Sequence, residues 1–518
     1  MTLGFSTHNR VPMKWVAIFG IIGFAASFVL TMDGPNLPSG DSVNLVQSAK
    51  SISASGVHGF PTFGMKEDAE LVMIDTKPNT VWPPMMSAAT AALTGMGIDL
   101  QSAVRWQTVL LSALTLMSCF ILSCEITRSI VGGVATTTLL LILFPFRYWL
   151  LEGFMAEGIF ISTTVLCVVA AHRLLQKATV PSWWQLILLG AFAGTTYYQK
   201  SVAPAFIVSV PLMVLLKSGK LADRVRICTS YFMGSFAICL PLFLRNLSLG
   251  TVGGSGPGAR THAMAESALS LVRLFVPRHG AFTESTRAIV MGGLLLLLIG
   301  LFSLLIIWKL PQRKICLGSL ARTLRMGVPA RLLSICYVGM YILAVLAALY
   351  LVPKASHIET RYWMEMAPFF MPVCWWLMTA VIERIDPLFR KVAIVLVALG
   401  LVNVVAASLI EQGRTAGFQR NILQSGSHQL EMRQKICRML SVAGDVAFIS
   451  NQGYRLETET GLTSVIEEHA KRLEGVHVAY AAYPEESASS MSLVKNPPQP
   501  PNGWKLLGIV GEISIYGP

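Results

Sequence analysis

The sequence contains few charged residues. Only 13% of its 518 residues are Asp, Glu, Lys or Arg, whereas 53% are hydrophobic, and the mean hydropathy is +0.58. Soluble domains carry about 25% charged residues. The scarcity of charge excludes a conventional soluble enzyme, a disordered chain and a fibrous protein. It favours a protein embedded in a lipid bilayer.

Several familiar signatures are also missing. The nine cysteines show no CxxC spacing, and Cys437 is the only one in the polar C-terminal part, so this part cannot form an internal disulfide. No HExxH, GxSxG, Walker or GxGxxG pattern occurs, which disfavours protease, esterase, nucleotide-driven and dinucleotide chemistry. The sequence also lacks the internal repeat that marks many transporters.

Apolar runs, by contrast, are abundant and predict about eleven transmembrane helices. The first covers Lys14–Met32, follows a short basic start and has no small-residue cleavage site, so we expect an uncleaved anchor. The other runs lie near residues 106–123, 131–150, 158–172, 183–199, 203–216, 228–244, 288–308, 332–352, 364–382 and 392–410. The predicted fold is therefore mainly α and polytopic over a transmembrane domain of residues 1–410.

Basic residues predict the orientation of these helices. The net charge is +13, from 41 basic and 28 acidic residues, and most of the surplus falls in alternate loops such as 217–226 and 309–331. The positive-inside rule places these loops and the N-terminus in the cytoplasm. The partner of this surplus is then the lipid bilayer and not nucleic acid. Loops 33–105 and 245–287 and residues 411–518 are expected on the outer face.

The first outer loop is predicted to contain helices of its own. Residues 43–52 carry apolar side chains at helical spacing, which indicates an amphipathic helix lying on the membrane with Ser39 or Asp41 at its N-cap. A second apolar stretch begins at Trp82 and is too short to span the bilayer.

The C-terminal part, residues 411–518, is predicted to be a small extracytoplasmic α/β domain. Its pattern indicates helices near 428–442 and 462–473. Strands are expected near 445–450, 477–483 and 505–517.

Ionisable residues gather at the outer ends of the predicted helices, where charge is costly and suggests function. They are Asp41, Arg147, Glu152, Glu157, Lys200, Arg245 and Arg361. A phosphate near the bilayer surface is the natural partner of the cations, which depart from the positive-inside pattern. Plainer interpretations stay open: Asp41 as a helix cap, Arg147 and Arg361 reaching lipid headgroups, and the two glutamates neutralising Arg147.

The order of these motifs resembles the GT-C superfold of polyprenyl-phosphate-dependent membrane glycosyltransferases. The nearest likeness is to the branch of protein O-mannosyltransferases and aminoarabinose transferases. The matching segments are GDSVNLVQSAKSI (40–52), VWPPMMSAATAAL (81–93), GIDLQSAVRWQTVL (97–110), FMAEGIFI (154–161), GAFAGTTYYQKSVAPAF (190–206), LPLFLRNLSLG (240–250), IETRYWMEMAPFF (358–370) and GDVAFISN (444–451).

The resemblance implies transfer of a sugar from a polyprenyl-phosphate-linked donor to a glycan, lipid or protein acceptor on the outer face. It implies an inverting single displacement with Asp41 as the general base, although Asp33 competes for that role. The residues implied in binding the donor phosphate are Lys200, Arg245, Arg361, Tyr362 and Arg147. Glu157 would position the acceptor or, with Asp41, a metal. Many relatives have two adjacent acids where this chain has Asp41 and Ser42, and this departure counts against a metal at that position. Whether the reaction uses a divalent metal stays open.

The implied setting is a bacterial cell envelope, in the inner or plasma membrane, with a cytoplasmic N-terminus and an extracytoplasmic C-terminal domain. Two other functions stay open. One is a transporter or flippase for an anionic lipid or small anion, because the chain is polytopic and has cations near the outer face. The other is a non-catalytic scaffold whose C-terminal domain binds a partner.

Overall fold

The computed structural model describes the chain in stretches. These are residues 11–35, 40–65, 71–79, 83–143, 146–176, 180–216, 220–249, 329–351 and 360–382, with short pieces beyond residue 390. The chain forms two compact units. The first consists of residues 1–24, 111–149 and 156–418, and the second of residues 25–110, 150–155 and 419–518. The predicted run 288–308 lies outside the described residues, as does the run 392–410 apart from position 394.

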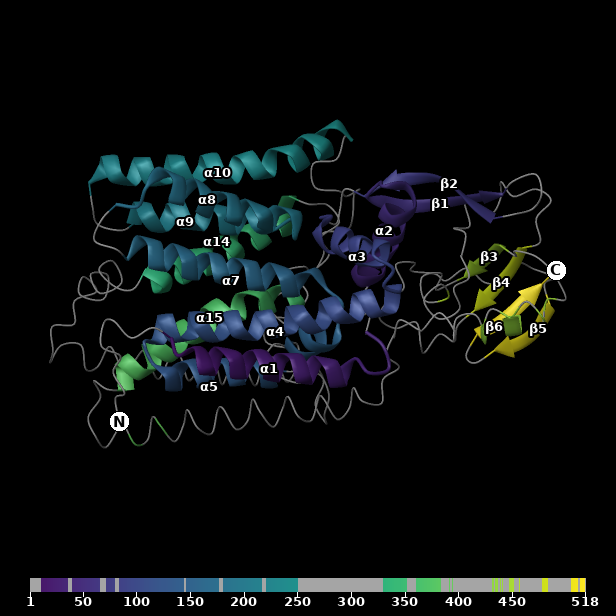
Figure 1. Ribbon diagram of the computed structural model, residues 1–518, viewed down its shortest axis with the longest axis horizontal. Coiled ribbons are helices and arrows are strands. Elements are labelled where there is room, and N and C mark those ends of the chain that lie inside the picture. Colours follow the sequence, from purple (N-terminus) through teal and green to yellow (C-terminus); the bar gives the residue numbers. More distant parts are fainter. Residues whose placement is uncertain are drawn as a thin grey trace. The chain divides into compact units, whose positions relative to one another are not determined.

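The first unit is a bundle of apolar helices whose long axes are aligned (Figure 1). Two helices are divided between the units: the first part of α1 (Met13–Leu30) and the second part of α4 (Leu100–Thr127) belong to the first unit. The other helices of this unit are α5 (Ile130–Ile142), α7 (Ala156–Leu175), α8 (Trp183–Gly194), the 3₁₀ turn η2 (Thr195–Tyr198), α9 (Ala203–Leu216), α10 (Leu221–Ser248), α14 (Pro329–Leu351) and α15 (Thr360–Ile382).

The helices of this bundle have the length and surface of membrane helices. Among the described residues, α1, α4, α7 and α10 are long and apolar enough to cross a bilayer, whereas α5, α9 and Pro329–Val345 are apolar but shorter. Large apolar side chains stay exposed on α8 and α10, including Trp184, Leu188, Phe232, Met233 and Phe236. Such exposure suits a lipid environment. The described part is therefore a mainly helical membrane protein, and the predicted number of eleven spans is not confirmed.

Among the described helices, α8 and α10 pack backbone against backbone. A Cβ atom on Gly190 would lie 1.9 Å from the Tyr231 carbonyl oxygen, and one on Gly234 would lie 2.0 Å from the Ile187 carbonyl oxygen. Only glycine permits this approach, as at other membrane-helix interfaces. The pair fixes the position of Gly194, after which the chain turns into η2 and the loop before α9.

The predicted third span, 131–150, is not one continuous helix. The structure has α5 ending at Ile142, and a π-helical turn, η1 (Arg147–Glu152), follows. Proline ends helices at or before the residue that precedes it, and Pro145 stands between these two elements. This break brings Arg147 and Glu152 out of a regular helix.

The second unit contains the first predicted outer loop. Its elements are α2 (Gly40–Ser55), β1 (Gly59–Met65), β2 (Leu71–Pro78) and α3 (Met85–Gly95). Strands β1 and β2 pair antiparallel, with Gly59 opposite Pro78, and a bulge interrupts the register after Thr62. Helix α3 confirms the prediction of a short, non-spanning apolar helix after Trp82.

Helix α2 confirms the predicted helix but not its predicted place on the membrane. Its polar residues Ser42, Asn44, Gln47 and Ser48 are buried, as are its apolar residues Leu45, Val46 and Ala49. A surface helix would keep its polar side in water. Two of its polar side chains bond to protein instead: Asn79 Nδ2 donates to Ser48 Oγ at 3.0 Å, and Ser42 Oγ donates to Met155 Sδ at 2.7 Å. Because α2 begins at Gly40, Asp41 lies in its first turn and not at its N-cap.

The C-terminal part contains a four-stranded mixed sheet. The strands β3 (Ala447–Ser450), β4 (Val478–Ala482), β5 (Lys505–Val510) and β6 (Ile513–Gly517) lie in the order β3-β4-β6-β5. The first two are parallel and the other pairs antiparallel. All three predicted strand regions are present, while the domain boundary at residue 410 stays a prediction.

Candidate functional site

Lys200 lies in a short connection between two helices of the bundle. Helix α8 tightens into η2, Gln199 closes that turn, and the Lys200 carbonyl accepts a hydrogen bond from the Ala203 backbone N–H at the start of α9. The side chain is only 12% exposed. A buried ammonium needs nearby anions, because burial without compensation is strongly unfavourable.

Two glutamates supply those anions. Glu157 lies in the first turn of α7, is 2% exposed, and its Oε1 accepts a hydrogen bond from Lys200 Nζ at 2.7 Å. Glu365 lies in α15, is fully buried, and its Oε1 contacts the same Lys200 Nζ. The three residues, here called the Glu157–Lys200–Glu365 cluster, join three segments that are far apart in the sequence.

Glu365 is held from its other side by a tyrosine. Tyr341 Oη of α14 donates to Glu365 Oε2 at 2.8 Å. Its neighbour Tyr337 packs its ring edge-on against Phe369, Phe206 and Tyr341, with centroid distances of 4.6, 5.4 and 5.7 Å. These rings exclude water from the inner side of the cluster, which strengthens its electrostatic interactions.

Sequence reasoning had identified Lys200 and Glu157, and the structure brings these two together. It had missed Glu365 and Tyr341. A signal for Glu365 was present, because it is an acid inside an apolar run and stands four residues after Arg361, on the same side of a helix. Arg361 and Tyr362 lie in the first turn of α15, one turn before Glu365, and their side chains lie outside the described part.

The other predicted site residues belong to other elements. Arg245 lies in the last turn of α10, where its Nη1 donates to Asn246 Oδ1 at 3.2 Å. Arg147 begins the π-helical turn η1. Asp41 lies in α2 of the second unit, and its side chain is outside the described part.

The cluster does not fit a divalent metal. The Lys200 ammonium contacts both carboxylates and so occupies the position that a cation between them would take. Within the part of the chain that the structure describes, no three His, Cys, Asp or Glu side chains group as metal ligands.

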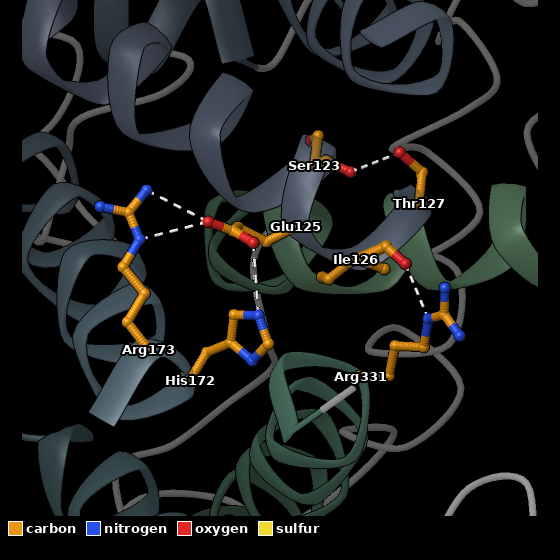
Figure 2. A network of polar contacts seen from close by, with 7 residues as sticks. All are labelled: Ser123, Glu125, Ile126, Thr127, His172, Arg173 and Arg331. Carbon is orange, nitrogen blue, oxygen red and sulfur yellow. Dashed lines mark hydrogen bonds and ion pairs between the residues drawn. The ribbon is translucent and has the colours of Figure 1, made fainter. Parts of the chain in front are cut away.

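A second polar network lies at the other end of α7, about 22 Å along the helix from Glu157. Figure 2 shows Glu125 between His172 and Arg173, with nitrogen–oxygen distances of 3.3 and 3.1 Å. Arg331 Nε donates to the Ile126 carbonyl oxygen at 2.7 Å, and its guanidinium lies 4.2 Å from the Trp376 ring centroid. This network connects α4, α7, α14 and α15, and we interpret it as structural, because its contacts hold the four helices together.

Comparison with known proteins rests on the fold. No protein-family model matches the sequence, and no curated protein matches it. The structure of ArnT from Cupriavidus metallidurans bound to undecaprenyl phosphate aligns over 98% of both chains, with 12% identity and a TM-score of 0.52. The apo structure of the same protein aligns over 97% of this chain and 98% of that one, with 11% identity and a TM-score of 0.55.

The chain has the GT-C fold. The end-to-end alignment with ArnT decides this, because it covers the bundle, the outer loop and the C-terminal part together. At 12% identity the likeness concerns the fold alone. The predicted GT-C superfold is therefore confirmed at the level of the fold, and the apolar helices support the predicted integral membrane protein.

Proposed function

We propose that this chain transfers a sugar from a polyprenyl-phosphate-linked donor to an acceptor at the outer face of the membrane. The observation that carries the proposal is the alignment, over 98% of both chains, with a protein whose structure holds undecaprenyl phosphate. The buried Glu157–Lys200–Glu365 cluster adds support, because ionisable groups inside an apolar bundle are costly and are typically functional.

The proposed reaction is an inverting single displacement. The acceptor hydroxyl attacks the anomeric carbon, its proton passes to the Asp41 carboxylate, and the bond between that carbon and the phosphate oxygen breaks. The lipid phosphate then gains a second negative charge. Fixed cations stabilise that charge as it develops, so a strong general acid is not required.

The cations proposed for this task are Arg361, Arg245, Arg147 and Lys200, with Tyr362 as a hydrogen-bond donor. Lys200 differs from the arginines, since two carboxylates already contact its ammonium. We assign it a shared role: it contacts the donor phosphate while Glu157, beside it, positions the acceptor. No step in this scheme uses a metal.

The proposed setting follows the charge pattern of the loops. The N-terminus is cytoplasmic, the transmembrane domain comprises residues 1–410, and residues 411–518 form an extracytoplasmic domain in a bacterial cell envelope. The identity of the sugar, a mannosyl group among the candidates, is left to experiment.

The test is to incubate the purified full-length protein with a panel of polyprenyl-phosphate sugars and to measure release of polyprenyl phosphate. D41N is expected to lower turnover at least about 100-fold, the usual scale for loss of a general base, with an unchanged melting temperature. D99N is the matched control, because Asp99 belongs to the same predicted outer loop, is exposed, and asparagine keeps a side-chain oxygen that can accept the hydrogen bond from the Ser102 backbone N–H.

Near-normal turnover in D41N would remove Asp41 from the role of base. Movement of the intact donor across the bilayer, with no release of polyprenyl phosphate from any donor in the panel, would favour a flippase instead.

A further inference from the structure

The three members of the Glu157–Lys200–Glu365 cluster are buried to different depths. Lys200 is 12% exposed, Glu157 2% and Glu365 0%. A ligand that approaches the cluster therefore meets Lys200 first, and Glu365 lies behind it. Any new anion at Lys200 must share the ammonium with carboxylates that are already there.

Glu365 depends on Lys200 for a compensating positive charge within the described part of the chain. Helices α14, α5 and α7 pack against α15, the helix that carries Glu365. Helix α14 presents the hydroxyls of Tyr341 and Tyr337, α7 presents Glu157, and α5 has no titratable residue in its sequence. Within the described part of the chain, Lys200 is the one cation that acts on Glu365, and it is shared with Glu157.

We propose that Glu365 takes up one proton from solvent when the donor phosphate binds to Lys200, and so acts as a positioning residue that releases the ammonium to the phosphate. This inference rests on the proposed function only for the identity of the ligand as a lipid phosphate. Physically, a fully buried carboxylate that loses its share of a cation is less costly when neutral than when charged. Tyr341 can serve both forms, because its hydroxyl can donate to a carboxylate or accept from a carboxylic acid.

The proposal makes a quantitative statement about binding. If one proton enters with each phosphate, the Kd rises by about tenfold per pH unit over the range in which the free protein has Glu365 charged and the complex has it neutral. The sign follows from mass action: a higher proton concentration favours the complex, so binding weakens as the pH rises.

The probe is a polyprenyl methyl phosphodiester, which keeps a single negative charge over the tested range from about pH 6 to about pH 9. Its binding to the purified full-length protein is measured as a function of pH. The wild type is expected to show the rising Kd. In E365Q the side chain is always neutral, so the Kd is expected to vary by less than about twofold and to lie below the wild-type value at the alkaline end.

Tighter binding in a variant is a result that mere structural damage does not produce. E365D keeps a titratable group and is expected to restore the pH dependence. E125Q is the matched control, because Glu125 is also paired with basic side chains but belongs to the network at the other end of α7 (Figure 2). It is expected to keep the wild-type slope.

If E365Q does not fold, proton uptake by the wild type can be tested by a second measurement. Infrared difference spectra should show a protonated carboxyl band when the probe is added to the wild type. Y341F, which removes one hydrogen bond to the charged carboxylate, should shift the rise in Kd to higher pH.

Equal pH slopes in wild type and E365Q, or no carboxyl band on binding, would overturn the proposal. Binding with these features but without sugar transfer would leave it standing and would instead refute the proposed function.

Discussion

Replacing Lys200 with methionine is expected to destabilise the protein strongly. K200M keeps most of the apolar stem but leaves two buried carboxylates, those of Glu157 and Glu365, without their shared cation. Removing one partner of a buried ion pair costs about 3–5 kcal/mol in the free energy of unfolding. The low end is expected here, because the carboxylates can bind protons and so lose part of their charge.

The chain offers an internal control, an ion pair with the same distance between nitrogen and oxygen. Lys435 and Glu431 also lie 2.7 Å apart, but their side chains are 54% and 59% exposed. Exposed pairs spaced four residues apart in a helix contribute no more than about 0.5 kcal/mol. K435M should therefore change the free energy of unfolding far less than K200M, although the two pairs have the same distance between nitrogen and oxygen.

Denaturant titration in mixed micelles measures both variants under one condition. A third variant, K200M with E365Q, neutralises the deeper carboxylate and is expected to regain about 0.5–3 kcal/mol, the usual range of coupling between contacting residues. If K200M and K435M lose the same stability, Lys200 is not buried between carboxylates in the folded protein. The proposed site would then lose its basis.

Two further predictions concern the packing that supports the site. G190A should lower the free energy of unfolding by at least about 1–3 kcal/mol, since its Cβ would collide with the Tyr231 carbonyl oxygen. The control is G339A, in a helix where nothing lies within 4 Å of the added Cβ, and it should instead stabilise the protein by about 0.5–1 kcal/mol. If G190A and G339A have equal melting temperatures, α8 and α10 do not pack so closely. R331M loses the charged hydrogen bond to the Ile126 carbonyl and should cost about 1.5–3 kcal/mol, with faster hydrogen exchange at the end of α4. R331K should recover only part of the lost stability, because lysine cannot stack its side chain in plane on the Trp376 ring. Unchanged hydrogen exchange in R331M would contradict the structural role of the network.

Much of the fold could be predicted because helices in lipid must be apolar over a fixed length. This rule predicts the runs that contain α1, α4, α7 and α10. The strands of the C-terminal part follow from a different signal, short apolar runs with the patterning of strands. The break after α5 was missed because an apolar run continues through Pro145 and Arg147. In hydropathy alone, a helix and a break in a helix look the same.

Two of the three residues of the cluster could be predicted, because the signals for those two are local in the sequence. Lys200 and Glu157 stand at turns, where a charge interrupts an apolar pattern. Glu365 lies within an apolar run of α15, and its place in the site depends on contact with Lys200, which is 165 positions away in the sequence. Nothing in the sequence near residue 365 indicates that partner, so its pairing could be learned only from the folded chain.

The burial of α2 has a consequence for the order in which the protein is made. Ser42, Leu45 and Ser48 of this helix bind Met155, Ser87 and Asn79, and each of these partners is synthesised later than α2. During synthesis, α2 therefore emerges before any of the groups that satisfy its polar side. Its buried polar side chains are therefore expected to stay hydrated until synthesis has passed Met155. The part of the molecule that carries Asp41 is thus completed late, and a chain stopped before residue 155 should leave α2 accessible to protease and to water.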